Sequence, residues 1–131
     1  VNSYLGKYAV TCMSEQHCPC NDIPGIRREA EMGDVAALLA PRPVLFVNGL
    51  QDPLTTTSAR ESFAVAHRAY QLLGVPNYAK LLEPHRLGHA YDNQLAIGWF
   101  RRWLLRPHEL RAGAATARSA RAPDAPESRD T

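Results

Sequence analysis

The sequence predicts an α/β domain in which parallel strands are joined by a crossover helix. Three consecutive segments carry this prediction: an apolar run at 44–48, an amphipathic segment at about 58–73, and a second short run at 78–82. Parallel strands need a connection of a dozen or more residues, and such a connection is usually a right-handed helical crossover. We therefore expect a parallel sheet with helices packed on it.

The first 39 residues are expected to hold little regular structure before one short helix. Val1 to Val10 fits the end of a strand that runs into a loop or short helix, and Thr11 to Ile26 shows neither a helical nor a strand period. From Glu29 to Leu39, apolar residues recur at helical spacing, and the early carboxylates suit the helix dipole. Prolines at 41 and 43 end this helix.

The central strand, Val44 to Asn48, is uniformly apolar up to its last residue, as strands covered on both faces are. In the helix that follows, Ser58 to Glu61 reads as a capping box, and Gly74 followed by Pro76 marks the C-terminus. Its expected apolar face consists of Phe63, Ala66, Tyr70 and Leu73. Tyr78 to Leu82 is the second expected strand.

The last expected helix begins after Asp92, a plausible N-cap, and runs to about Leu105 with a broad apolar stripe that should pack on the sheet. From Pro107 onward the chain holds no aromatic or β-branched aliphatic residue, so it cannot bury enough apolar surface to offset the entropy of ordering. We expect one domain over 1–105 and a disordered tail over 106–131.

Composition and charge exclude two classes of partner. No apolar run approaches the roughly 20 residues of a membrane span. The net charge is only +2, and up to Leu105 ten basic residues nearly balance nine acidic ones. We therefore expect neither nucleic acid nor a membrane as a partner.

Two polar residues follow the ends of the two expected strands. Asp52 comes after the strand at 44–48, and His89 comes after the strand at 78–82. Open α/β sheets bind ligands at the carboxyl ends of their strands. In a Ser-His-Asp triad the carboxylate fixes the imidazole tautomer and stabilises the imidazolium. No Gly-x-Ser-x-Gly turn occurs in the chain, so the third member lies outside it or does not exist.

Simpler explanations exist for each of these residues and for their rivals. Asp-Pro often opens a turn, and a histidine near a helix start can be a cap or a packed ring. The shared placement of Asp52 and His89 at strand ends favours catalysis over these explanations. The other acids considered, none of which follows an apolar strand, are Asp22, Asp34 and Asp92. The other histidines are His17, His67, His108 and the main rival, His85, which follows Pro84 and lacks a flanking glycine.

A cluster near the N-terminus, His17 with Cys12, Cys18 and Cys20, invites a metal interpretation. A structural zinc site needs four ligands, usually in paired Cys-x-x-Cys units, and one Cys-x-Cys with a single histidine falls short of that spacing. We expect loop cysteines or one adventitious disulfide, with no metal and no cofactor.

The motifs resemble a known family. They are Glu31-Met32-Gly33-Asp34, the run Ala37 to Leu45, Gly49 with Asp52-Pro53-Leu54, and Gly88-His89. Together they resemble the C-terminal part of an α/β-hydrolase of the acetyl-xylan-esterase and dienelactone-hydrolase-like group, over Val1 to Leu105. The resemblance implies that Asp52 is the triad acid and His89 the triad base. It also implies that the nucleophilic serine and part of the oxyanion hole lie upstream of Val1.

The functional hypothesis is the C-terminal fragment of a serine carboxylic-ester hydrolase. Its expected partners are a small-molecule or carbohydrate-linked ester and the upstream N-terminal part of the same hydrolase, and the fragment alone is expected to be inactive. One alternative is a peptidase of the prolyl-oligopeptidase kind, which shares the plan of strand, Asp, helix, strand and His. Another is a non-catalytic binding or remnant domain that keeps the fold.

Overall fold

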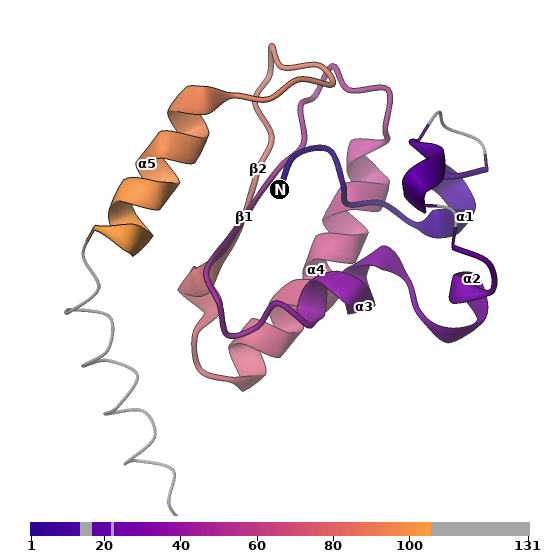
Figure 1. Ribbon diagram of the computed structural model, residues 1–131, viewed down its shortest axis with the longest axis horizontal. Helices are drawn as coiled ribbons and strands as arrows, with labels where there is room; N and C mark the ends of the chain where they lie inside the picture. Colours follow the sequence, from indigo (N-terminus) through magenta and orange to yellow (C-terminus); the bar gives the residue numbers. More distant parts are fainter. Residues whose placement is uncertain (14–16, 22, 106–131) are drawn as a thin grey trace, which may run out of the picture.

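The chain has an α/β structure, and the computed structural model describes residues 1–13, 17–21 and 23–105 (Figure 1). The expected disordered tail, with His108, and the loop residue Asp22 lie outside these ranges. The elements are α1 (Tyr8–Thr11), the 3₁₀ turn η1 (Pro19–Asn21), α2 (Ile26–Glu29), α3 (Met32–Ala37), β1 (Val44–Val47), α4 (Thr56–Leu72), η2 (Pro76–Tyr78), β2 (Ala79–Leu82) and α5 (Asn93–Leu104).

The parallel crossover predicted from the sequence is confirmed. Strands β1 and β2 pair in parallel, with Val44 opposite Ala79 and Val47 opposite Leu82, and α4 connects them. The N-terminal segment lies along the other side of β1, where Asn2 forms a parallel bridge with Val47. Three chain segments that run in the same direction therefore reach the same edge of the sheet.

Helices α3 and α4 cover one face of the sheet (Figure 1). The core on this face consists of Leu5, Ala36, Val44, Phe46, Ala59, Ala66, Tyr70 and Ala79. The two helices approach closely at Gly33, where a Cβ atom would lie 2.6 Å from the carbonyl oxygen of Ser62. The predicted buried face of α4 is correct for Ala66 and Tyr70 but wrong for Leu73, which follows the helix and is half exposed.

The ends of the helices differ partly from the prediction. Gly74 adopts the left-handed conformation expected after α4 (φ +74°). The helix expected over 29–39 is shorter in the structure, because the backbone of Ala30 is extended. Helix α3 begins after this break, and the Asp34 side chain stabilises its start by accepting a bond from the Glu31 amide (2.9 Å). The predicted capping box at Ser58 is wrong, since the N-cap of α4 is Thr55, three residues earlier.

Ser58 and Ser62 instead fasten the N-terminal segment to α4. The Ser58 hydroxyl accepts a hydrogen bond from the Lys7 amide (2.7 Å), and the Ser62 hydroxyl donates to the Gly6 carbonyl (2.6 Å). Glu61, the other expected capping residue, pairs with the Lys7 ammonium group. These bonds tie residues 6 and 7 to the start of α4.

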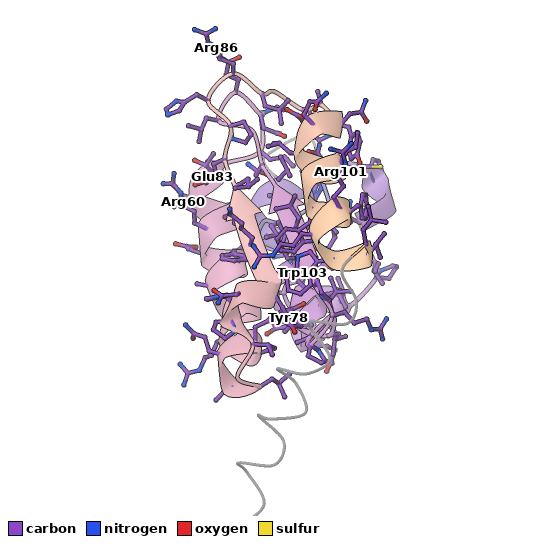
Figure 2. All side chains as sticks on the ribbon, turned by 90° about the vertical axis from the view of Figure 1, so that its left-hand side faces the viewer. Arg60, Tyr78, Glu83, Arg86, Arg101 and Trp103 are labelled. Atoms are coloured by element: carbon purple, nitrogen blue, oxygen red, sulfur yellow. The ribbon has the colours of Figure 1, made fainter. Side chains whose placement is uncertain are left out.

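Helix α5 lies over the opposite face of the sheet (Figure 1). Trp103 is buried and meets the ring of Tyr78 edge-on at a centroid distance of 4.4 Å (Figure 2). A cleft of about 200 Å³ separates the rest of the helix from β1 and the N-terminus. Within α5, Phe100 is 53% exposed and Leu104 is 67% exposed, so the expected packing on the sheet is achieved only in part.

Candidate active site

The turn after β1 carries Asp52 and is held by local hydrogen bonds. The Asp52 amide donates to the Gly49 carbonyl (3.1 Å), and the Leu54 amide donates to Oδ1 of Asp52 (2.9 Å). A side chain that accepts a bond from the amide two residues ahead forms an Asx-turn, which explains the Asp-Pro sequence here. The turn therefore fixes both the backbone and the carboxylate of Asp52.

A second set of bonds joins this turn to the loop that carries His89. The amide of Asn48 donates to the Leu82 carbonyl (2.9 Å), that of Leu50 to the Pro84 carbonyl (3.1 Å), and that of Gln51 to the Leu87 carbonyl (3.0 Å). The parallel pairing of β1 and β2 thus continues past the strand ends as loop-to-loop bonding, and it brings the two predicted site residues together.

Gly49 makes this close approach possible. A Cβ atom at this position would lie 1.9 Å from the Leu87 carbonyl oxygen and 2.9 Å from that of Gly88. Both obstacles are backbone atoms, which cannot move aside as a flexible side chain can. Glycine is required here because the histidine loop lies directly against the turn.

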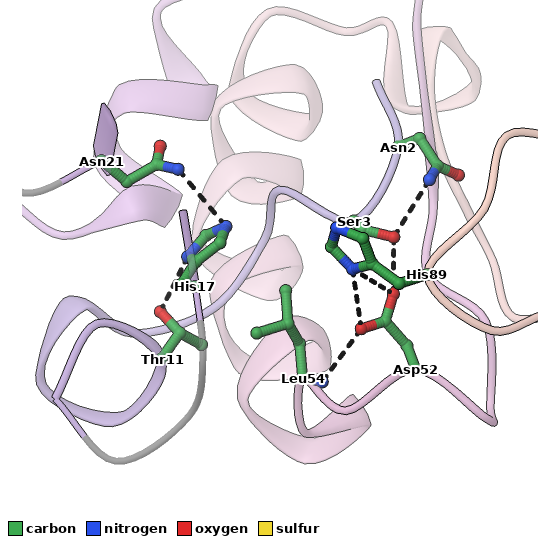
Figure 3. Close-up of polar contacts among 8 residues, drawn as sticks. All are labelled: Asn2, Ser3, Thr11, His17, Asn21, Asp52, Leu54 and His89. Atoms are coloured by element: carbon green, nitrogen blue, oxygen red, sulfur yellow. Dashed lines mark hydrogen bonds and ion pairs between the residues drawn. The ribbon is translucent and has the colours of Figure 1, made fainter. Parts of the chain in front are cut away.

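The predicted approach of Asp52 and His89 is confirmed. Nδ1 of His89 lies 3.2 Å from both Oδ1 and Oδ2 of Asp52 (Figure 3). The Asp52 side chain is 0% exposed, whereas the His89 side chain is 56% exposed. A buried carboxylate facing one ring nitrogen of a solvent-facing imidazole has the arrangement of a triad acid and base.

A third polar residue, Ser3, completes the surroundings of the carboxylate, and sequence reasoning missed it. Its hydroxyl donates to Oδ2 of Asp52 at 2.6 Å (Figure 3). Ser3 follows the bridge between Asn2 and Val47, so it too lies past the end of a parallel segment. Asp52 and His89 were selected because each follows an apolar strand. Ser3 also follows a segment of the sheet, but only two residues precede it, and no apolar run marks that segment as a strand.

These neighbours set the charge of Asp52. Burial acts to raise the pKa of the carboxyl group, but the bonds from the Ser3 hydroxyl and the Leu54 amide, together with His89, outweigh it and lower the pKa below its usual value. Asp52 is therefore a carboxylate at neutral pH and can stabilise a positive charge on His89.

This lowered pKa predicts how stability depends on pH. The charged form of Asp52 contributes stability that is fully present above the pKa of about 3.9 in the unfolded chain. This stability is lost as the pH falls through the lower pKa of the folded chain. We expect Asp52→Asn to destabilise the chain most near neutral pH and progressively less below about pH 4. Urea unfolding of both chains across this range measures the difference, and a constant difference would contradict the expectation.

Among the rival acids and histidines, Asp34, Asp92 and His67 have structural partners of their own. Asp34, in the first turn of α3, accepts a bond from the Glu31 amide. Asp92 caps α5 by accepting bonds from the amides of Gln94 (2.8 Å) and Leu95 (3.1 Å), as predicted. His67 stacks on Phe63 within α4. His85 is exposed on the loop before His89.

His17 lies in a separate cluster with Thr11 and Asn21, away from Asp52 and His89 (Figure 3). There Nδ1 of His17 lies 3.2 Å from the buried hydroxyl of Thr11. Cys12 carries a free thiol. Among the described residues, no three side chains of His, Cys, Asp or Glu are grouped so that they could hold a metal ion.

Comparison of the chain with family models, with curated proteins and with solved structures found no match. The likeness to esterases stated above therefore stays a prediction based on its motifs. In the described ranges, no helix has both the length and the apolar character needed to cross a membrane.

Proposed function

We propose that this chain is the C-terminal part of an α/β-hydrolase of the acetyl-xylan-esterase and dienelactone-hydrolase-like group. In this proposal Asp52 and His89 are the acid and base of a serine enzyme that cleaves carboxylic esters. The observation that carries it is the pair itself, a buried carboxylate 3.2 Å from Nδ1 of an exposed imidazole at the carboxyl edge of a parallel sheet.

The chemistry follows from which ring nitrogen faces the carboxylate. The Asp52 carboxylate accepts a hydrogen bond from Nδ1–H of His89, so the basic lone pair of His89 is on Nε2. Nε2 takes the proton of the nucleophilic hydroxyl as it attacks the ester carbonyl, and later gives that proton to the leaving alcohol. The Asp52 carboxylate stabilises the imidazolium between these two transfers.

Within the described ranges, the serine hydroxyls are bonded to groups other than the ring of His89. Ser3 donates to Asp52, Ser58 accepts from the Lys7 amide, and Ser62 donates to the Gly6 carbonyl. Since the sequence also holds no Gly-x-Ser-x-Gly turn, the proposal places the nucleophile, with part of the oxyanion hole, on a strand-to-helix turn upstream of Val1. The proposed substrate is a small-molecule or carbohydrate-linked ester.

The upstream part of the same hydrolase is the proposed partner of the uncovered apolar surface. Helix α5 exposes large apolar side chains at Ile97, Phe100 and Leu104, and the cleft beside it is lined largely by apolar residues of β1 and α5. An apolar surface of this kind is typical of an interface between parts of one fold.

Restoring activity from two parts tests the proposal. The chain alone is expected to hydrolyse p-nitrophenyl acetate no faster than a heat-denatured control, because acid and base without a nucleophile cannot form an acyl-enzyme. Adding the segment encoded immediately upstream, fused or as a separate chain, is expected to restore turnover. A fluorophosphonate is also expected to label a serine of that segment in the joined protein.

Three outcomes would contradict the proposal or change it. An upstream sequence without a Gly-x-Ser-x-Gly turn, with no activity in the joined protein, would favour a remnant domain. Hydrolysis by the chain alone that His89→Ala abolishes would place the nucleophile inside it. Faster cleavage of a prolyl p-nitroanilide than of the ester would favour the peptidase alternative.

A further inference from the structure

Ser3 has an unusual backbone conformation for its position. Its amide donates to the Val47 carbonyl (2.8 Å), so it continues the pairing of Asn2 with β1. Its φ is +47°, in the left-handed region, which costs free energy for any residue with a Cβ atom. Ser3 is also 6% exposed. The fold thus keeps a side chain at a position where glycine would be easier to accommodate, which indicates that the hydroxyl is used.

The hydrogen bonds around Ser3 have a defined direction. Asp52 is a carboxylate and can only accept, so the Ser3 hydroxyl donates its proton to Oδ2 at 2.6 Å, a short bond typical of a charged acceptor. The oxygen of that hydroxyl accepts from the side-chain amide of Asn2 at 3.0 Å. Asn2 therefore donates to Ser3, and Ser3 donates to Asp52, so this chain of hydrogen bonds ends on the carboxylate (Figure 3).

The carboxylate is held from two sides. The Leu54 amide bonds Oδ1, the Ser3 hydroxyl bonds Oδ2, and Nδ1 of His89 lies at the same 3.2 Å from both oxygens. Loss of either donor would let the carboxylate rotate about its side-chain bonds. The symmetric approach of the imidazole would then be lost.

We propose that Ser3, supported by Asn2, is a positioning residue that fixes the orientation of the Asp52 carboxylate toward His89. Its effect on the carboxylate is independent of the enzyme activity, whereas its effect on turnover rests on the proposed function. Ser3 is not the nucleophile in this arrangement, because its proton is already directed to the acid.

The test uses two variants and one matched control. Ser3→Gly removes the hydroxyl and also relieves the left-handed strain, which offsets part of the cost of the lost hydrogen bond, so the chain is expected to stay folded. Ser3→Ala removes the hydroxyl and keeps the Cβ atom. Ser62→Ala removes another buried serine hydroxyl, which bonds the Gly6 carbonyl and not Asp52.

The first measurement is the pKa of Asp52. NMR of the isotope-labelled chain gives it from the chemical shift of the Asp52 carboxyl carbon as the pH is changed. Both Ser3 variants are expected to raise the pKa of Asp52, because the charged form loses a donor, and Ser62→Ala is expected to leave it unchanged. A folded Ser3→Gly chain with an unchanged Asp52 titration would overturn the proposal, whether or not the chain takes part in ester hydrolysis.

The second measurement uses the protein joined to its upstream segment. Ser3→Gly is expected to lower kcat by about tenfold, the order expected for loss of one charge-assisted hydrogen bond, with KM unchanged. Fluorophosphonate labelling should stay stoichiometric. Loss of that label would show that Ser3 is the nucleophile, and an unchanged kcat would show that it does not position the acid.

Discussion

Replacing His89 with alanine in the protein joined to its upstream segment is expected to lower kcat for an ester by roughly 10⁴- to 10⁶-fold. In the proposed mechanism, loss of the base leaves only binding and oxyanion stabilisation. Asp52→Asn should cost about 10⁴-fold, since the amide no longer holds the imidazole in the active tautomer. The geometry behind both values is the 3.2 Å approach of Nδ1 to the buried carboxylate. Steady-state kinetics on p-nitrophenyl acetate measure the effects.

The matched control is His85→Ala. His85 lies in the same loop, four residues earlier, and is exposed, so its loss should leave kcat within about twofold, as for a surface substitution. If His85→Ala abolished turnover and His89→Ala did not, the assignment of the base would be wrong. Far-UV circular dichroism of each variant separates a loss of chemistry from a loss of folding.

The parts of the fold that could be predicted depend on local signals. The strand at 44–48, the helix ended by Gly74 and the N-cap at Asp92 are each encoded within one segment. The structure contains all three, with the strand one residue shorter, at Val44–Val47. Asp52 and His89 could be brought together from the sequence because parallel strands align their carboxyl ends at one edge.

The parts that could not be predicted depend on contacts between distant segments. Ser58 and Glu61 have the residue types of a capping box, but they bond Lys7 instead, because the N-terminal segment lies across the start of α4. Ser3 reaches Asp52 through a segment that contributes only one bridge to the sheet. Local sequence patterns carry no record of such partners.

The need for glycine at position 49 is another such contact, and it leads to the second large effect. Gly49→Ala would place a Cβ atom 1.9 Å from the Leu87 carbonyl oxygen. The turn that carries Asp52 and the loop that carries His89 must then separate. Overpacking of this kind typically costs about 1–3 kcal/mol of stability. A shift of about 1 Å between acid and base can cost roughly 100-fold in turnover. Urea unfolding of the chain and kinetics of the joined protein measure the two effects.

Gly88→Ala is the matched control for this prediction. It lies in the same loop beside His89, but its Cβ atom would be 3.6 Å from the Gln51 carbonyl oxygen, an ordinary contact. We expect it to change stability by less than about 1 kcal/mol, the range of a substitution without steric conflict. Equal losses in the two variants would mean that flexibility of the loop, and not its contact with the acid turn, positions His89. A loss confined to Gly49→Ala would show that this contact holds the acid and the base together.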